Sequence, residues 1–297
     1  MSDQRVDNAE ALVKGIVDLP TLPQVITTLM TMLDDPDASV RDINNVMGKD
    51  QTLVAKMLKL VNSAFYAIPK RVTSVAQAIA ILGFKTVKSI VLSASIIGMF
   101  DGDDEYFNYQ EFWANSLGVA TISRFIILRL SDDPMSGCSL IHPDSGFVAG
   151  LLGGIGKVVL EQYCHDDFAG IIDKAKDEKL SFHEAEATVI NTNYADIGYC
   201  LTRRWNMSEE VQVPIRYQDE LDKCPDEHRS LAAVLSLAKY LCRLKRYGQS
   251  GDFDDPPRPP KQAAHVLSLS KDTLPNLTSG LTEEFAKAEA FLSMIRT

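Results

Sequence analysis

Residues 39–61 read SVRDINNVMGKDQTLVAKMLKLV, and this stretch predicts two consecutive α-helices. Ser39, three residues before Asp42, is a typical start for the first helix, and Gly48 ends it. Asp50 can cap the second helix, in which apolar residues recur every three or four positions. These residues are Leu53, Val54, Met57, Leu58 and Val61. A period of this kind indicates helices that bury one face against a core.

The helical period continues on both sides of this stretch, and no strand pattern competes with it. Ser74 opens a further helix that Gly83 ends, and an almost entirely apolar helix follows at 86–98. Later helices are expected at 112–130, 147–163, 167–178, 181–204, 208–217, 229–244 and 282–295. The sequence therefore predicts an all-α fold.

Two changes in composition divide the chain into three predicted segments. An acidic turn, DGDDEYFNYQ at 101–110, separates an N-terminal helical lobe (1–105) from a second helical lobe (106–250). The stretch DFDDPPRPPK at 252–261 is too rich in proline for regular structure, so it predicts a linker or surface strap. The third segment, 251–297, then consists of this linker and a C-terminal helix.

The chain is acidic, because its 297 residues include 30 Lys+Arg and 40 Asp+Glu, a formal net charge of −10. An acidic surface repels phosphate backbones, so we expect no nucleic-acid binding. The five cysteines form no C-x-x-C pair, which argues against a zinc ribbon. No apolar run reaches the roughly 18 residues of a membrane span, and the N-terminus lacks the pattern of a secretory signal. We therefore expect a cytoplasmic protein that does not bind membranes.

The segment GLLGGIGKVVL at 150–160 has some features of a phosphate-binding loop but fails its requirements. A Walker A loop has four residues between its first glycine and Gly-Lys, followed by Ser or Thr. Here five residues separate Gly150 from the Gly-Lys pair, and Val158 follows. The dinucleotide-binding fingerprint also fails, since its third glycine is missing and no strand precedes the segment. A glycine inside a helix costs about 1 kcal/mol relative to alanine, so the adjacent Gly153 and Gly154 need another explanation.

A wider set of motifs resembles the HDOD family, the HD-related output domain of bacterial signalling proteins. The motifs include LPTLP at 19–23, LKLVNSAF at 58–65 and the Gly-Lys segment above, in the family's order. The resemblance extends over residues 12–245 and implies a two-lobed, all-helical HDOD/HD-like domain with a C-terminal helical extension. It also implies kinship with HD-domain phosphohydrolases, in which histidines and aspartates hold divalent metals that activate water against a phosphate ester.

Each position where the family places a metal ligand holds another residue in this chain. Where the family reads Gly-Leu-Leu-His-Asp-Ile-Gly-Lys, Gly153 and Gly154 replace the His-Asp pair, and the later His-His pair aligns with Tyr217 and Gln218. An ammonium group at Lys239 would repel a cation. The resemblance thus implies no metal and no other cofactor. It implies instead a vacated pocket, a candidate ligand site, lined by Asn115, Gly153, Gly154, Tyr194, Gln218 and Lys239.

The remaining histidines offer no second metal site. His165 and Asp166 form an HD dipeptide, but we expect Asp166 or Asp167 to cap the following helix and His165 to lie in a surface loop. His183, Glu184 and Glu186 could put two donors on one helical face, although the helix dipole already explains a carboxylate in the first turn.

The most basic cluster is predicted near the end of the helix at 229–244. It consists of Lys239, Arg243, Lys245 and Arg246. One interpretation is a cationic helix C-terminus, which the helix dipole favours. The other is that Lys239, with Arg203 or Arg204, recognises a small anionic ligand or an acidic partner.

These observations predict a non-catalytic output or adaptor module of bacterial signal transduction that binds a signalling protein or a small anionic ligand. One alternative is a metal-dependent phosphohydrolase that acts on a nucleotide or a cyclic dinucleotide, which requires bound divalent metal. A second alternative is a nucleic-acid-binding regulator, since the helix pairs at 39–47 and 51–62 and at 75–82 and 86–98 each resemble a helix-turn-helix. In both pairs the wide spread of apolar residues on the second helix favours core packing instead.

Overall fold

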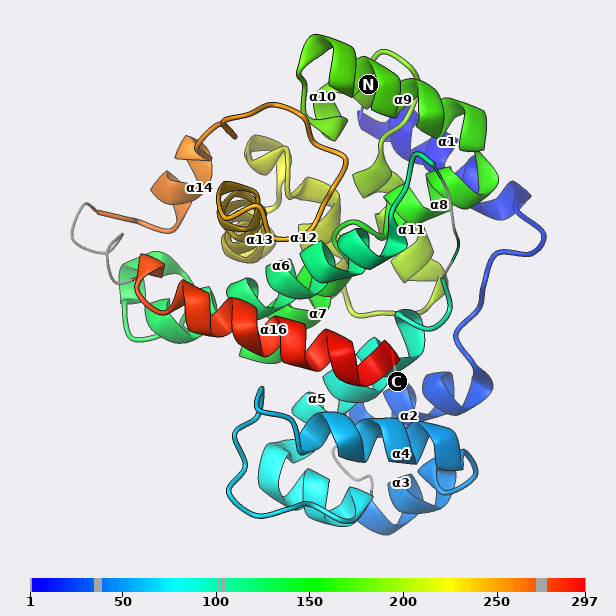
Figure 1. Cartoon of the computed structure of the whole chain (residues 1–297), viewed down its shortest axis with the longest axis vertical. Coiled ribbons are helices and arrows are strands. Elements are labelled where there is room, and N and C mark those ends of the chain that lie inside the picture. The colour runs from blue at the N-terminus through cyan, green and yellow to red at the C-terminus, as the bar shows by residue number, and fades with distance from the viewer. Residues whose placement is uncertain (1, 35–38, 101, 103–104, 271–276, 297) are drawn as a thin grey trace. The chain divides into compact units, whose positions relative to one another are not determined.

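A computed structural model of the chain describes residues 2–34, 39–100, 102, 105–270 and 277–296. Every regular element in these ranges is a helix (Figure 1). The predicted all-α fold is therefore confirmed. Part of the acidic turn predicted at 101–110 lies outside the described residues.

The chain folds into two compact units, and each unit contains segments that are distant in the sequence. One unit joins Met1–Leu19 to Gly102–Phe285, and the other joins Pro20–Asp101 to Ala286–Thr297. These units follow contacts rather than chain order. The division into 1–105, 106–250 and 251–297 stays a prediction about domains.

The smaller unit contains α2 (Gln24–Asp34), α3 (Val40–Met47), α4 (Gln51–Val61) and α5 (Val75–Ile96). Three of these helices begin where the sequence predicts. The side chains of Ser39, Asp50 and Ser74 each accept a hydrogen bond from the backbone N–H three residues further on. Such caps satisfy donors that the first turn of a helix leaves unpaired.

Helix α5 is long and apolar enough to cross a membrane by length and composition, and half of its most apolar window is buried in the protein. Its backbone is broken at Gly83, whose φ of 80° lies in the left-handed region. The helix end predicted at Gly83 is therefore present as a kink. A second segment passes the same test of length and composition only if two helical stretches, Pro143–Tyr163 and His165–Glu178, are counted together, and these two are bent by 119° relative to each other.

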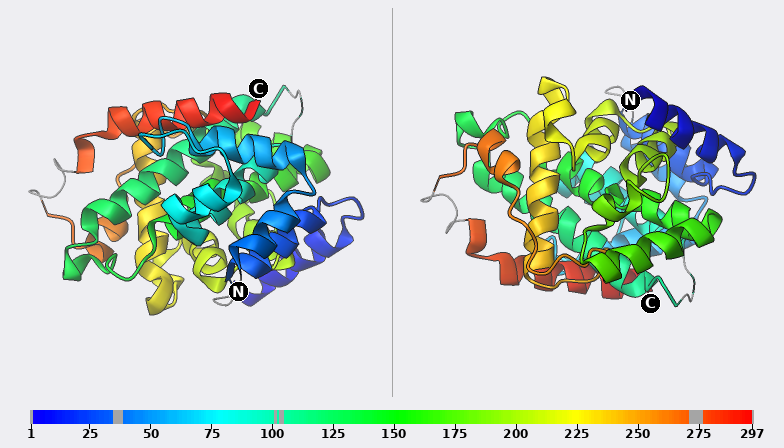
Figure 2. Two further views of the ribbon diagram at one scale, coloured as in Figure 1. Left: turned by 90° about the horizontal axis from the view of Figure 1, so that it is seen from below. Right: turned by 90° about the horizontal axis from the view of Figure 1, so that it is seen from above.

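The larger unit is built around α6 (Tyr109–Leu130), α7 (Pro143–Leu152) and α13 (Asp226–Leu244), which pack against one another (Figure 2). Its other α-helices are α1 (Ser2–Gly15), α8 (Ile155–Tyr163), α9 (His165–Glu178), α10 (Phe182–Glu186), α11 (Tyr194–Arg204), α12 (Glu209–Tyr217) and α14 (Lys261–Val266). Short 3₁₀ turns lie at Pro134–Ser136 and Leu221–Lys223, and α16 (Leu281–Arg296) begins in this unit and ends in the smaller one.

Two predicted helices are each divided in the structure. The predicted helix at 147–163 is broken at Gly153 and Gly154 into α7 and α8, and the one at 181–204 is interrupted by residues 187–193. Lys157 of α8 and Tyr194 of α11, which follow the two interruptions, line the same cavity.

The expected cap of α9 is wrong. The helix starts at His165 after Cys164, which makes no side-chain capping bond. Asp166 and Asp167 therefore lie in the first turn, where the helix dipole favours their charge, and His165 is an exposed helical residue rather than a loop residue.

Candidate functional site

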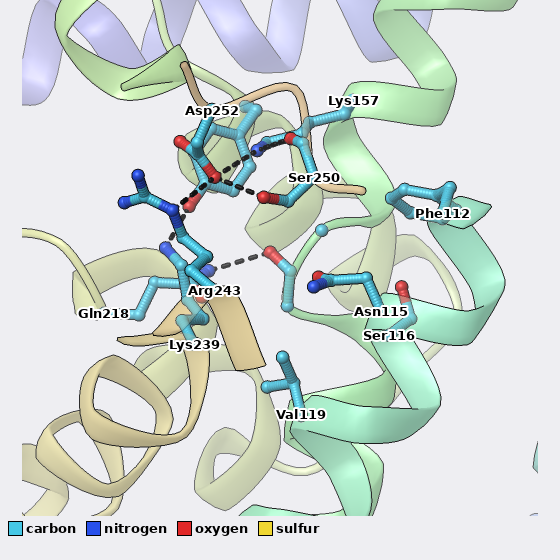
Figure 3. Close-up of a pocket in the computed structure, with 14 residues that line it drawn as sticks. Phe112, Asn115, Ser116, Val119, Lys157, Gln218, Lys239, Arg243, Ser250 and Asp252 are labelled. Carbon is cyan, nitrogen blue, oxygen red and sulfur yellow. Dashed lines mark hydrogen bonds and ion pairs between the residues drawn. The ribbon is translucent and has the colours of Figure 1, made fainter. Parts of the chain in front are cut away.

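A small cavity of about 30 Å³ lies inside the larger unit, where α6, the α7–α8 junction, α11, α12 and α13 meet residues 247–258, which we call the strap. All six residues of the predicted pocket line it: Asn115, Gly153, Gly154, Tyr194, Gln218 and Lys239. The structure adds residues that were not in that prediction, chiefly Phe112, Lys157, Arg243, Ser250 and Asp252 (Figure 3). A volume of this size holds one or two water molecules.

The two glycines at the α7–α8 junction are closely covered by neighbouring side chains. Gln218 Nε2 donates to the carbonyl oxygens of Gly153, at 2.8 Å, and Ile215, at 2.9 Å. A Cβ atom on Gly153 would lie 3.0 Å from Gln218 Oε1, and one on Gly154 would lie 3.0 Å from the Phe112 ring. A His-Asp pair therefore does not fit here unless Gln218 and Phe112 move.

Lys239 is held in a charged hydrogen-bonded triangle on the opposite side of the cavity. Its ammonium donates to Asp219 Oδ1 and to the Tyr194 hydroxyl, both at 2.6 Å, and Tyr194 donates to Asp219 Oδ2. Burial, and next the Asp219 charge, hold the pKa of Tyr194 well above its ordinary value, so the phenol stays protonated. Burial would raise the pKa of Asp219, but Lys239 and His183 outweigh it and lower that pKa. The triangle is thus a neutral cluster of one cation, one anion and one phenol.

Lys157, the lysine of the Gly-Lys motif, is buried in α8 and directed at the strap. Its ammonium donates to the carbonyl oxygen of Ser250 at 2.5 Å and lies over the rings of Phe182 and Tyr194, at 4.5 and 4.6 Å from their centroids. Burial lowers the pKa of Lys157, and the nearby Asp252 carboxylate opposes that effect. The charge of Lys157 is therefore stabilised by the strap and the two rings.

The strap carries the acidic residues that balance the cations of this region. Asp252 Oδ2 lies 3.9 Å from Lys157 Nζ and 3.8 Å from Arg243 Nε. Arg243 Nη2 also donates to the Asp254 carbonyl oxygen at 2.8 Å and to its carboxylate. The sequence predicts a linker or surface strap at 252–261, which overlaps this segment, but it does not predict these roles. The signal that could have indicated them is the run DFDD, which follows shortly after the basic end of α13.

Asn115 does not point to a ligand-binding role, because its amide donates to the carbonyl oxygen of Tyr247 at 3.0 Å. The suggested grouping of Lys239 with Arg203 or Arg204 is wrong. Arg204 donates to the carbonyl oxygen of Val13 in α1 at 3.0 Å, and neither arginine lines the cavity. The cations that line it with Lys239 are Lys157 and Arg243.

A buried acid–base pair lies beside the cavity at α10. Ser181 and Glu184 form a capping box, so the predicted helix-start role holds for Glu184. Glu186 is different, because it is fully buried, its Oε1 lies 2.9 Å from His183 Nδ1, and its Oε2 accepts from the Tyr194 N–H at 2.8 Å. Burial raises the pKa of Glu186 to about 7. The helix dipole alone does not explain this residue.

The residues of the cavity do not fit a divalent metal. Two lysines, Lys157 and Lys239, line it. The Asp252 carboxylate of the lining and the neighbouring Asp219 carboxylate already pair with cationic side chains. Within the described ranges, no three His, Cys, Asp or Glu side chains are grouped as a metal site requires.

This fold and this site define an all-helical domain in which the charged side chains around an internal cavity pair with one another. The profile of the HDOD domain matches residues 19–221, and the chain therefore belongs to the HDOD family. An uncharacterised protein of Treponema pallidum (strain Nichols) is 24% identical over 236 residues. That alignment includes 80% of this chain but 44% of the relative, so the chain spans less than half of that protein's length.

Solved structures share the fold over nearly the whole chain. An HDOD domain protein of unknown function from Geobacter sulfurreducens has a TM-score of 0.81 and 24% identity, covering 98% of this chain and 99% of that one. A Shewanella amazonensis SB2B protein, named for a proposed phosphohydrolase activity, has a TM-score of 0.74 and 22% identity over 96% and 98% of the two chains. A Marinobacter aquaeolei VT8 protein, named for a proposed role in signal transduction, has a TM-score of 0.77 and 20% identity, and covers 99% of this chain and 66% of that one. At these identities the likeness establishes the fold alone.

Proposed function

We propose that this chain is a non-catalytic output or adaptor module of bacterial signal transduction that works in the cytoplasm. It acts by contacting a signalling protein or by sensing a small anionic ligand, and it does not hydrolyse phosphate esters. Membership of the HDOD family supports the signalling role.

One observation carries the proposal, namely that the junction expected to supply a His-Asp pair consists of Gly153 and Gly154 under Gln218 and Phe112. Metal-assisted hydrolysis needs several nitrogen or oxygen ligands around one ion and an open coordination position for water. A cavity with Lys157 and Lys239 in its lining opposes that arrangement, since each ammonium repels a divalent cation.

A hydrolysis assay tests the proposal against a metal-dependent phosphohydrolase. The full chain is incubated with phosphomonoester, nucleotide and cyclic dinucleotide substrates in the presence of Mn²⁺, Fe²⁺ or Mg²⁺. We expect no turnover above that of a matched preparation treated with EDTA. Turnover that depends on metal and is abolished by Lys239→Ala would contradict the proposal, because it would assign the cavity to catalysis.

A further inference from the structure

Several donors and cations converge on the Asp252 carboxylate, whose side chain is 8% exposed (Figure 3). Oδ1 accepts a hydrogen bond from the Phe182 backbone N–H at 2.8 Å, and Oδ2 accepts one from Ser250 Oγ. Lys157 Nζ and Arg243 Nε lie within 4 Å of Oδ2, at 3.9 and 3.8 Å. Hydrogen-bond donors combined with cations in a largely dry space are an arrangement with which proteins bind anions.

The helical part of the site is cationic without the strap. Three cations of the helices, Lys157, Lys239 and Arg243, face one carboxylate from that part, Asp219, and the strap supplies two more, Asp252 and Asp254. Removing the Asp252 charge would leave an excess of positive charge in a largely buried space, which strongly favours entry of an anion.

A wider cleft adjoins the small cavity and shares part of its lining. Tyr194, Lys239, Arg243 and Asp252 line both the small cavity and a neighbouring cleft of about 260 Å³. One contact of the strap is weak, because Arg246 pairs with Asp255 with both side chains more than 60% exposed, whereas the Arg243–Asp254 pair is largely buried. The Asp252 carboxylate is therefore one of several buried contacts that hold the strap, together with Asp254 and the Ser250 carbonyl oxygen.

We propose that the cavity is an anion-binding site whose resident anion is Asp252, a ligand tethered by the strap, and that a small carboxylate or phosphate replaces it when the strap is displaced. The proposal rests on the proposed function, since both require a site that holds no metal. As a tethered group, Asp252 has a high effective concentration, so free anions bind only when this carboxylate is removed.

The proposal that a free anion can replace the Asp252 carboxylate is tested by chemical rescue, in which small anions are added to the Asp252→Ala variant of the full chain. The midpoint of thermal unfolding (Tm) is measured at pH 7 against increasing formate, acetate or phosphate, with ionic strength matched by potassium chloride. We expect the substitution to lower Tm by about 5–10 °C, because it leaves buried cations unpaired. Formate, acetate or phosphate should then restore at least half of the loss with saturation, while chloride does not.

Two controls make the result decisive. Asp255→Ala removes an exposed carboxylate of the same strap, and it should show neither the loss nor the rescue. Asp252→Ser, which keeps an acceptor for the Phe182 N–H, provides the same titration if Asp252→Ala does not fold. The relative rescue by formate, acetate and phosphate identifies the size of anion that the site accepts.

No saturable, anion-specific rise of Tm in the variant that folds would overturn the inference. That failure leaves the proposed function intact, whereas metal-dependent hydrolysis by the unmodified chain would overturn the proposed function itself.

Discussion

Lys239 and Asp219 are charged partners whose side chains are only 21% and 19% exposed. Replacing one of them leaves the other without its counter-ion in a poorly solvated place, and the loss exceeds that of a surface ion pair. The pair therefore fixes α13 against the residues that follow α12. In this chain, a salt bridge occupies a position that the family resemblance assigns to metal binding.

We predict that Lys239→Met lowers the free energy of unfolding by about 2 kcal/mol, since Asp219 loses its cation and Tyr194 loses a partner. Urea denaturation at pH 7 measures this. Arg258→Ala, which breaks the more exposed pair with Glu184, is the matched control and should cost less than about 1 kcal/mol. Equal losses in the two variants would contradict the assignment.

The His183–Glu186 pair predicts a pH dependence. Burial raises the pKa of Glu186 from 4.5 to about 7. Burial lowers the pKa of His183, but its hydrogen bond to Glu186 and the Asp219 charge outweigh this and raise it. Both groups bind protons more tightly in the folded state. The free energy of unfolding therefore falls as pH rises from 4.5 toward about 7, the window between the ordinary and the raised pKa of Glu186. Asp219 and Asp252 have lowered pKa values and affect stability only at more acidic pH.

We expect Glu186→Gln to flatten the fall of stability between pH 5 and pH 7 by about 1 kcal/mol per pH unit, the effect of one proton. Urea denaturation across this range measures the slope. Glu184→Gln is the control, because the pKa of Glu184 is lowered and lies outside the window. An unchanged slope in Glu186→Gln would show that the pair does not titrate as described.

At the scale of the elements, the break in α5 depends on Gly83. A Cβ atom there would contact nothing within 4 Å, so the cost of a side chain comes from the backbone, whose φ is 80°. Gly83→Ala should lower the free energy of unfolding by about 1 kcal/mol, as measured by urea denaturation. Gly15→Ala is the matched control, since its Cβ is equally free of contacts and its φ is not positive. Equal effects of the two substitutions would contradict this account of the kink.

Three helices of the smaller unit, α3, α4 and α5, could be predicted from the sequence because their signals are local, whereas α2 is not among the predicted helices. Ser39, Asp50 and Ser74 cap helices through atoms three residues away, and Gly83 breaks one through its own backbone. The break at Gly153 and Gly154 could not be located by periodicity, because it depends on Gln218, 65 residues away in the chain. Burial of Glu186 likewise depends on Tyr194 and the fold around it.

The family resemblance could predict that the six pocket residues lie together. It could not predict that Asp252 balances the positive charges of Lys157 and Arg243 beside them. Asp252 belongs to a proline-rich segment beyond the matched region, and its contacts with Lys157 and Arg243 span 95 and 9 residues of sequence. No periodic pattern marks a loop that returns to a buried site. The structure was required to identify the strap as part of the cavity.

At the scale of the whole molecule, the chain has an excess of ten negative charges, and some of its acidic residues pair with its most basic cluster. Acidic residues of the strap neutralise the basic end of α13, because Asp254 binds Arg243 and Asp255 binds Arg246. The cluster considered for binding anionic partners at the surface is therefore largely paired. We predict no mobility shift of duplex DNA at low salt, and a shift that weakens steeply with added salt would contradict this.

The cavity is stabilised by its own lysines and carboxylates, and we propose that it holds no metal. Elemental analysis of the full chain, purified without any chelator, tests this claim most directly. We predict substoichiometric manganese, iron and zinc, at the level of a blank preparation. One or more equivalents of any of these metals per chain, retained after dialysis, would contradict the account.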